Sequence, residues 1–441
     1  MMRKIIETIK NKFLHDHLIR NVIKNSGIIL FGNTTASAIN LFSFTIMANQ
    51  LGPATLALLV LAQTYTSILN DIFNVQTWES MVKFGADISD KKGIANVIKV
   101  NTILDGTSAL VAFFFALVLM VPIVNMLDWD RSLITVISFY SFSILFRLTS
   151  LTIGIPRLFN KFSALAHIQV VMAAFKLSCV LYIMFFANKF VYYAIVYLGI
   201  DVLNNAAIIV FSLILLRKHL DRGWWRKAIS LDRNQLIFIW WTNLRTIIRI
   251  PVRYFDMIVI SAVMPLKVVG IYKVYKEIAG ILDRFSDPIN QAIYPEFSKL
   301  IVANDVRKSQ TTAKKSILLL AGVSGAITLF LMLCSKLLIA RFFGVEYVSQ
   351  MPALYFLLML VGISFFLVPI NSLFVAAGFA KMGFYIVLFT NIIYLLTAFS
   401  LGKLIGIYGV VAAYGGQMFL NQGLKLYLMK KYPNEWNTII R

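Results

Sequence analysis

The chain has 441 residues, of which 59% are hydrophobic, and its mean hydropathy is +0.77. These values exclude a soluble globular protein, and the long apolar runs between residues 26 and 430 indicate a helical membrane protein rather than a β-barrel with short alternating segments. The net charge of +22 fits the basic loops of membrane proteins, so we expect membrane lipid and no nucleic acid as a partner.

The apolar runs divide into segments of about 20 residues, the length that a helix needs to cross a bilayer. We predict twelve such spans, at residues 26–49, 54–76, 101–124, 133–155, 163–187, 191–216, 236–262, 268–293, 316–340, 352–377, 382–402 and 406–428. With a cytoplasmic N-terminus, 28 of the 42 lysines and arginines fall on the inner side, and only five fall outside: Arg131, Lys189, Lys267, Arg341 and Lys403. The sequence therefore predicts an all-α membrane protein with both termini in the cytoplasm.

The polar segment 217–235 divides the spans into two sets of six. Residues 51–84 align with residues 264–300, at an offset of about half the chain, which indicates a parallel repeat of the kind found in two-lobed transporters. We predict a cytoplasmic N-terminal segment (1–25), an N-lobe (26–216), a cytoplasmic inter-lobe loop (217–235), a C-lobe (236–430) and a cytoplasmic tail (431–441). The two six-helix lobes are expected to be pseudo-symmetric.

Residues 236–301 carry ten charged side chains within two membrane-length segments. A charge in hydrocarbon costs from about 3 kcal/mol upward, so these side chains are expected to face a protein interior or a water-filled cavity. Arg245, Arg249 and Arg253 recur every four residues and fall in one sector of a helix, an arrangement suited to a phosphate or carboxylate. Internal pairing, with Asp256 and with the acids of span eight, is the alternative. Other central cations are Arg284, Arg147 and Lys176.

Four acids inside the spans are candidates for coupling to an ion: Asp71, Asp201, Asp256 and Glu277. Fixed salt-bridge partners are the alternative role for all four. The sequence has no catalytic motif, no metal-ligand spacing and no nucleotide-binding loop. We therefore expect no catalytic residue, no metal and no cofactor, and we expect any energy to come from an H⁺ or Na⁺ gradient.

Three stretches resemble a known family: LGPATLALLVLAQTYTSILNDIFNVQTWESMVKFGAD (51–87), VGIYKVYKEIAGILDRFSDPINQAIYPEFSKL (269–300) and GIYGVVAAYGGQMF (406–419). They look like the hallmark stretches of the polysaccharide transporter family, which includes the Wzx-type O-antigen flippases, within the superfamily that also holds the MATE drug exporters. The resemblance implies a two-lobed, V-shaped bundle with a cationic central cavity in the bacterial inner membrane.

The resemblance also implies a function: moving undecaprenyl-pyrophosphate-linked oligosaccharide from the inner to the outer leaflet by alternating access. Carried over by residue type and depth, the binding of pyrophosphate or acidic sugars is expected at Arg249, Arg253, Arg284, Arg147 and Lys176, with Arg245 added from the arginine ladder. Expected partners are the lipid-linked oligosaccharide, a polysaccharide polymerase and chain-length proteins. A MATE-like exporter of small molecules and a membrane-embedded polymerase or ligase are the alternatives.

Overall fold

The computed structural model describes residues 17–86, 91–221, 223–226, 229–303 and 305–432, and these residues form helices and short connections without a β-strand. Residues 1–16 of the predicted N-terminal segment (1–25) and residues 433–441 of the predicted tail (431–441) lie outside this range. The helices are α2 (His17–Phe73), α3 (Trp78–Ala86), α4 (Lys91–Met126), α5 (Ser132–Ser141), α6 (Ile155–Leu158), α7 (Phe162–Phe186), α8 (Phe190–His219), α9 (Arg233–Ile250), α10 (Asp256–Val263), α11 (Leu266–Val302), α12 (Val306–Leu338), α13 (Met351–Phe366), α14 (Val368–Ala376), α15 (Ala380–Ile405) and α16 (Ile407–Lys431).

Helix α2 is interrupted at Gly52, where φ is 69° and ψ is 167°. A positive φ is accessible to glycine without a steric cost, and Pro53, the next residue, has no N–H to continue the helical hydrogen bonds. The 57 residues of α2 are therefore two helices joined at Gly52. The break falls between the predicted first and second spans, at residues 26–49 and 54–76.

Seven described helices are long and apolar enough to cross a membrane, or eight when a bent pair is counted as one span. They are Thr34–Phe73, Lys92–Met126, Phe162–Phe186, Phe190–His219, Val306–Phe343, Met351–Ala376 and Ala380–Ile405, with Ser132–Phe146 and Ser150–Leu158 as the pair bent by 51°. The chain is thus a multi-pass membrane protein.

The predicted total of twelve spans is larger for physical reasons. The two halves of α2 count as one helix, the charges of α9 and α11 make those helices less apolar than a typical span, and α10 has only 8 residues. Helix α16 has a polar face that includes Gln417, Asn421 and Lys425. The number of spans and the cytoplasmic position of both termini stay predictions.

The chain forms two compact units that do not follow its two halves. Unit 1 comprises Met1–Phe44, Phe73–Phe114 and Ser141–Thr242, and unit 2 comprises Thr45–Ile72, Phe115–Tyr140 and Asn243–Arg441. Helices α2 and α4 each contribute to both units. The predicted lobes at 26–216 and 236–430 stay a prediction.

Unit 1 is built on α3, α4, α6, α7 and α8. Its apolar core contains Met81, Ala95, Ile98, Leu151, Ile155, Leu215, Leu216 and Leu220. Helices α2 and α7 touch at Gly32, where a Cβ atom would lie 2.5 Å from the Cβ of Ala166. This close approach holds the next turns of α2 opposite α7.

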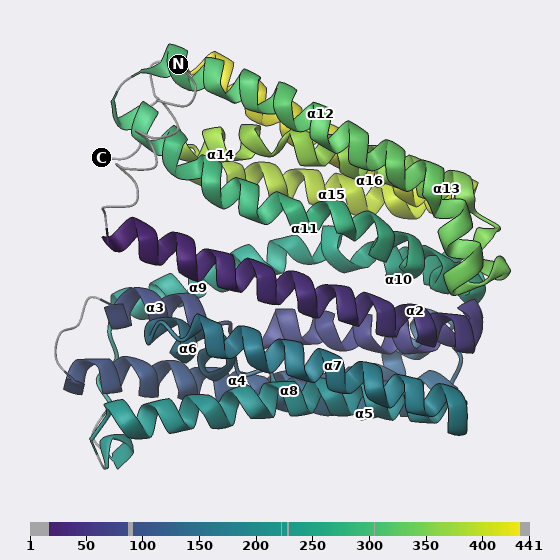
Figure 1. Cartoon of the computed structure of the whole chain (residues 1–441), viewed down its shortest axis with the longest axis horizontal. Helices are drawn as coiled ribbons and strands as arrows, with labels where there is room; N and C mark the ends of the chain where they lie inside the picture. Colours follow the sequence, from purple (N-terminus) through teal and green to yellow (C-terminus); the bar gives the residue numbers. More distant parts are fainter. Residues whose placement is uncertain (1–16, 87–90, 222, 227–228, 304, 433–441) are drawn as a thin grey trace. The chain divides into compact units, whose positions relative to one another are not determined.

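Unit 2 contains α10 to α16 and the second half of α2, and α15 and α16 run side by side in it (Figure 1). Its apolar core includes Phe297, Ile301, Ala313, Ile370, Leu373, Phe374, Phe379 and Met429. Gly270 at the start of α11 packs against the backbone of Pro53, since a Cβ there would lie 1.9 Å from the Pro53 carbonyl oxygen. These contacts fix α11 against α2 beside the cavity described next.

Candidate functional site

Unit 2 encloses a cavity of about 420 Å³ between α9, α10, α11, α13, α15 and α16, here called the charged cavity. Five of its wall residues are ionisable acids or bases: Arg249, Arg253, Asp256, Lys276 and Asp283. The remaining wall residues are Val252, Tyr272, Ala279, Leu357, Val361, Val387, Asn391, Tyr414 and Gln417. A wall of this composition combines charge with hydrogen-bonding groups on an apolar frame, as ligand pockets do.

The helix that carries the arginines is interrupted by a π-helical segment, Pro251–Phe255, between α9 and α10. Pro251 has no N–H, so the regular helical hydrogen bonding is interrupted at this point. Asn391 Nδ2 on α15 donates to the Ile248 carbonyl at 2.5 Å, and Gln417 Nε2 on α16 donates to Asn391 Oδ1 at 3.1 Å. Wider π turns are frequent at functional sites and change which side chains share a face. Arg249 and Arg253 line the cavity, whereas Arg245 does not.

Asp256 is held by partners on α11. Its carboxylate is 5% exposed and accepts hydrogen bonds from Lys276 Nζ at 2.7 Å and from the Tyr272 hydroxyl at 3.1 Å. Lys276 Nζ also donates to the Arg253 carbonyl at 2.8 Å. A buried carboxylate that is paired and hydrogen-bonded in this way is electrostatically compensated. Asp256 therefore fixes Lys276 on the cavity wall.

The partner of Arg253 is an acid from α2, far away in the sequence. Arg253 Nη1 lies 3.2 Å from Asp71 Oδ2, and the Tyr254 hydroxyl donates to the same oxygen at 3.0 Å. The side chain of Asp71 is 8% exposed, while that of Arg253 is 55% exposed. Asp71 thus binds the guanidinium through Nη1, and the rest of the Arg253 side chain remains accessible to solvent.

Two other predicted residues form a separate charge group on α11. Glu277 accepts from Lys273 Nζ at 2.7 Å and lies 3.5 Å from Arg284 Nη2. Neither Glu277 nor Arg284 lines the charged cavity. Lys425 on α16 donates to Asn371 Oδ1 at 2.6 Å.

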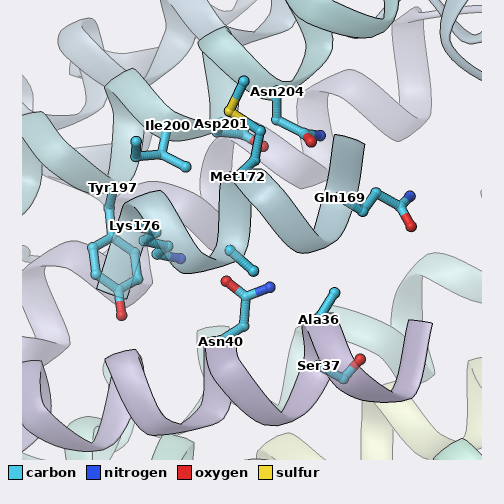
Figure 2. A pocket seen from close by; sticks show the side chains of 11 residues that line it. Ala36, Ser37, Asn40, Gln169, Met172, Lys176, Tyr197, Ile200, Asp201 and Asn204 are labelled. Carbon is cyan, nitrogen blue, oxygen red and sulfur yellow. The ribbon is translucent and has the colours of Figure 1, made fainter. Parts of the chain in front are cut away.

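Unit 1 encloses a second cavity, of about 560 Å³, here called the amide cavity. Figure 2 shows Ser37 and Asn40 of α2 facing the labelled side chains of α7 and α8. Its wall consists of Ala36, Ser37, Asn40, Gln169, Met172, Ala173, Lys176, Tyr197, Ile200, Asp201 and Asn204. Three side-chain amides supply both donors and acceptors of hydrogen bonds, and Lys176 Nζ lies 3.6 Å from the centroid of the Tyr197 ring.

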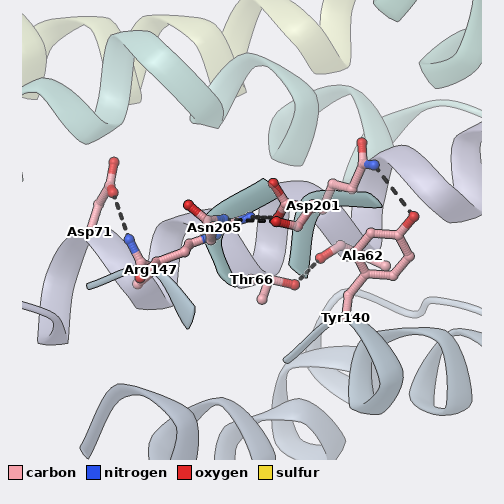
Figure 3. A network of polar contacts seen from close by, with 9 residues as sticks. Ala62, Thr66, Asp71, Tyr140, Arg147, Asp201 and Asn205 are labelled. Carbon is pink, nitrogen blue, oxygen red and sulfur yellow. Dashed lines mark hydrogen bonds and ion pairs between the residues drawn. The ribbon is translucent and has the colours of Figure 1, made fainter. Parts of the chain in front are cut away.

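Arg147 is positioned beside this cavity by a break in its helix. It follows the 3₁₀ segment Phe142–Phe146 and precedes the π segment Ser150–Gly154, where we had predicted a continuous span over 133–155. Asn74 Nδ2 donates to its carbonyl at 3.1 Å. The guanidinium pairs with Asp201 Oδ2 at 3.3 Å, and Asn205 Nδ2 donates to the Asp201 carbonyl at 2.9 Å (Figure 3).

The structure therefore separates the predicted site residues into groups. Arg249, Arg253 and Asp256 meet at the charged cavity, and Asp71 lies behind Arg253; Lys176 and Asp201 line the amide cavity, with Arg147 next to it. The sequence analysis missed the wall residues Tyr272, Asn391, Tyr414, Gln417, Gln169 and Asn204. In the sequence, these residues stand out only as polar residues within apolar runs. Such residues more often form hydrogen bonds between helices than they line a binding site. Within the described ranges, no three His, Cys, Asp or Glu side chains gather as a metal site requires.

Comparison with known families finds a match between residues 22–301 and the model of the family described as polysaccharide biosynthesis protein. No curated protein sequence matches the chain. Among solved structures, the inward-facing conformation of a multidrug resistance MATE family transporter of the MOP superfamily is similar with a TM-score of 0.73 and 16% identity, over 91% of this chain and 96% of that chain.

Two further structures share the fold. The lipid II flippase MurJ in its inward closed conformation has a TM-score of 0.65 and 15% identity, over 91% of this chain and 87% of that chain. A mutant of the Vibrio cholerae MATE transporter VcmN has a TM-score of 0.59 and 14% identity, over 96% of this chain and 98% of that chain. At these identities the similarity establishes a common fold, which is the fold of MATE and MOP-superfamily transporters.

Proposed function

Because this chain belongs to the family of polysaccharide biosynthesis proteins, we propose that it is a flippase for a lipid-linked oligosaccharide. Its substrate is an undecaprenyl-pyrophosphate-linked repeat unit of O-antigen or a related surface polysaccharide. The protein moves this substrate from the inner to the outer leaflet of the bacterial cytoplasmic membrane by alternating access. The likeness to the lipid II flippase MurJ, a protein of the same fold, supports this choice over other membrane functions.

The charged cavity is the observation that carries the proposal. A pyrophosphate is a compact polyanion, and guanidinium groups bind it with paired hydrogen bonds and keep their charge. Arg249 and Arg253 reach the cavity from one helix, and Lys276 adds a third cation there. We assign Arg249 to the phosphate first, because its exposed side chain lines the cavity and lies on the helix turn next to the one that presents Arg253.

The amide cavity supplies the chemistry for the sugar. Sugar hydroxyls both donate and accept hydrogen bonds, and Asn40, Gln169 and Asn204 present groups of both kinds. Lys176 adds a cation for the carboxylate of an acidic sugar. We assign Arg147 to this unit as a residue that positions Asp201.

Transport against a gradient requires coupling, and we propose an H⁺ or Na⁺ gradient as its source. Among the predicted acids, Asp71 has the arrangement that such a role needs, since one buried carboxylate is shared by Arg253 and Tyr254. Binding or release of an ion at Asp71 would change how strongly its carboxylate binds Arg253 and Tyr254. The polymerase and chain-length proteins are the partners that would receive the repeat unit at the outer leaflet.

The test uses a deletion strain that carries the wild-type gene, Arg249→Ala, Arg249→Lys or, as a control, Arg131→Ala, which lies in a connection outside both cavities. Polyprenyl-linked sugars are extracted, and their accessibility to a membrane-impermeant label is measured in intact spheroplasts. We expect complete repeat units to accumulate out of reach of the label in the deletion strain and with Arg249→Ala, to a lesser extent with Arg249→Lys, and not with Arg131→Ala.

Two other outcomes would replace the proposal. Repeat units that are reachable from outside but not polymerised would indicate an enzyme that acts after translocation. Unchanged lipid-linked sugars in the deletion strain, together with sensitivity to cationic drugs, would indicate a MATE-like exporter.

A further inference from the structure

A cluster of buried polar atoms lies in unit 1 at the break between α5 and α6. Its centre is Asp105 on α4, whose side chain has no exposed surface. Asp105 Oδ2 accepts a hydrogen bond from the Ser150 backbone N–H at 2.6 Å. Asp105 Oδ1 has no hydrogen-bond partner among the described residues. One carboxylate oxygen is therefore buried without a donor.

Asn101, one helical turn before Asp105, has the same deficit. It is also fully buried, and its Nδ2 donates to the Val97 carbonyl at 2.8 Å, which fixes the orientation of the amide. Asn101 Oδ1 then has no donor in the described part of the chain. Side chains four residues apart lie on the same face of a helix. Two acceptor oxygens thus lie one turn apart, and neither can satisfy the other.

An isolated buried carboxylate is costly unless it is neutralised, and a buried acceptor without a donor costs about 1–3 kcal/mol. One proton on Asp105 removes both deficits, because the carboxylic O–H donates to Asn101 Oδ1 while Oδ2 keeps the bond from Ser150. We propose that Asp105 is a proton-binding site of this protein, occupied in the conformation described here, and that this proton takes part in driving the transport cycle beside the ion exchange proposed at Asp71.

The surroundings also suit the ionised form. The hydroxyls of Ser150 and Thr102 are buried close to the carboxylate: Ser150 already donates its backbone N–H to Asp105, and Thr102 lies three residues before Asp105 on α4. A hydroxyl rotates to donate where it is needed. Release of the proton therefore leaves the carboxylate with donors within its own cluster, so both protonation states are supported.

The ionisable side chains on the elements around Asp105 have other contacts. Arg147 pairs with Asp201 at 3.3 Å, and Lys83, Lys99 and Arg157 lie over the rings of Phe238, Trp225 and Trp78 at 4.2, 5.7 and 4.4 Å from their centroids. Glu79 on α3 is the remaining acid of this group. No described hydrogen bond joins any of these side chains to Asp105, so a proton rather than a cationic side chain is the available counter-charge.

The position of Asp105 links the proton to the amide cavity. Ser150, which donates to Asp105, begins the helical segment that follows Arg147. Thr77 N–H donates to Thr149 Oγ1 at 3.2 Å, so the break is held between the loop after α2 and the carboxyl of Asp105. A change of charge at Asp105 acts on this break and hence on the Arg147–Asp201 pair beside the cavity.

The first experiment tests the proton without transport. Isotope-edited infrared spectra of the purified full-length protein, with labelled aspartate, are recorded at neutral pH for wild type, Asp105→Asn and Asn101→Ala. We expect a protonated carboxylic band in wild type that is lost in Asp105→Asn and shifted in Asn101→Ala. A spectrum of Asp105→Asn identical to that of wild type in this region overturns the proton site.

Thermal stability distinguishes a protonated Asp105 from an ionised Asp105 that the structure needs. In Asp105→Asn the new amide donates to Asn101 Oδ1 and its oxygen still accepts from Ser150, so thermal stability in detergent is expected to equal that of wild type or exceed it. A large loss of stability in Asp105→Asn would mean that a charged carboxylate is needed and would overturn the proposal. If Asp105→Asn does not fold, the infrared spectrum of Asn101→Ala decides. A carboxylic band that is not shifted in Asn101→Ala would also overturn the proposal.

The coupling role rests on the proposed function and is tested separately. In proteoliposomes, Asp105→Asn is expected to bind the lipid-linked oligosaccharide as wild type does and to lose the component of flipping that a pH gradient drives. A wild-type response to the gradient would overturn the coupling role. If wild type itself flips no lipid-linked sugar, the proposed function fails, while the infrared result still decides the proton site.

Discussion

The two cavities of this protein differ in how their polar groups are held. In the charged cavity, Asp256 and Asp71 hold cations of the wall through contacts of 2.7 and 3.2 Å. In the amide cavity, Asp201 pairs with Arg147 at 3.3 Å, and the other polar groups of the wall are mainly three amides, a hydroxyl and one lysine that lies against an aromatic ring. We therefore expect the charged residues of unit 2 to contribute to stability as well as to binding. Substitution of the amide residues of unit 1 should lower the free energy of unfolding less. Variants that separate these two properties test the comparison.

The largest expected effect is that of Lys276→Met. It leaves Asp256 buried with the Tyr272 hydroxyl and a backbone N–H but without a cation. Breaking a buried ion pair on one side costs about 3–5 kcal/mol, and we expect the lower end because Lys276 is itself 34% exposed. Unfolding in detergent measures the loss. The double variant with Asp256→Asn should recover much of it, and no recovery would show that the pair does not carry the effect.

Arg253→Ala and Arg249→Ala should separate stability from binding. Arg253→Ala removes a cation from the buried Asp71, which keeps the hydrogen bonds from Tyr254 and Asn70, and we expect this to cost about 1–3 kcal/mol of unfolding free energy. Arg249→Ala should change stability by less than about 0.5 kcal/mol, since the side chain is exposed, and should abolish binding of polyprenyl pyrophosphate. Equal effects of the two substitutions on both readouts would contradict this distinction.

Asn391→Leu tests the support of the π segment. The Ile248 carbonyl loses the hydrogen bond from Asn391, and one such bond contributes about 0.5–1.5 kcal/mol. We expect lower thermal stability and weaker pyrophosphate binding together, because the turn that carries Arg249 is no longer fixed. Val387→Leu, at another wall position of α15, serves as the control. Reduced stability with unchanged binding would show that the π segment does not position Arg249.

The smallest expected effect lies in the amide cavity. Gln169→Leu removes one donor and one acceptor from the wall and should weaken binding of the complete lipid-linked oligosaccharide by about 1 kcal/mol, or roughly fivefold. Binding of polyprenyl pyrophosphate without sugar should not change. Met172→Leu alters the same wall without removing an amide and should be neutral. An equal loss for both ligands would place the effect of Gln169 outside sugar recognition.

The helices could be predicted because their signal is local. The predicted spans fall largely on helical residues, with the span at 133–155 broken at Arg147, since long apolar runs determine both the helix and its place in a membrane. The break at Gly52 and the interruption at Pro251 are also local, as they follow from a glycine and from prolines. The break at Arg147 has no such residue at it. It is held by Asn74 and Thr77, which lie about 70 positions earlier in the chain.

The charge partners could not be predicted for the same reason. Asp256, three residues from Arg253, was the nearest acid in sequence, yet its cation is Lys276, and Arg253 pairs with Asp71 across 182 positions. Spacing along one helix shows which side chains share a face, whereas a partner on another helix depends on packing. The separation of Lys176 and Asp201 from the arginine ladder, in the other unit, is likewise a property of the fold.

The pairing of Asp71 with Arg253 also orders events during synthesis. A ribosome completes the second half of α2 well before it makes residue 253, so the carboxyl of Asp71 enters the membrane before Arg253 is there to pair with it. Until then the carboxyl relies on its other contacts, such as the hydrogen bond from Asn70 Nδ2 at 3.2 Å. Unit 2 is therefore finished late, by a segment that reaches back to a helix inserted early.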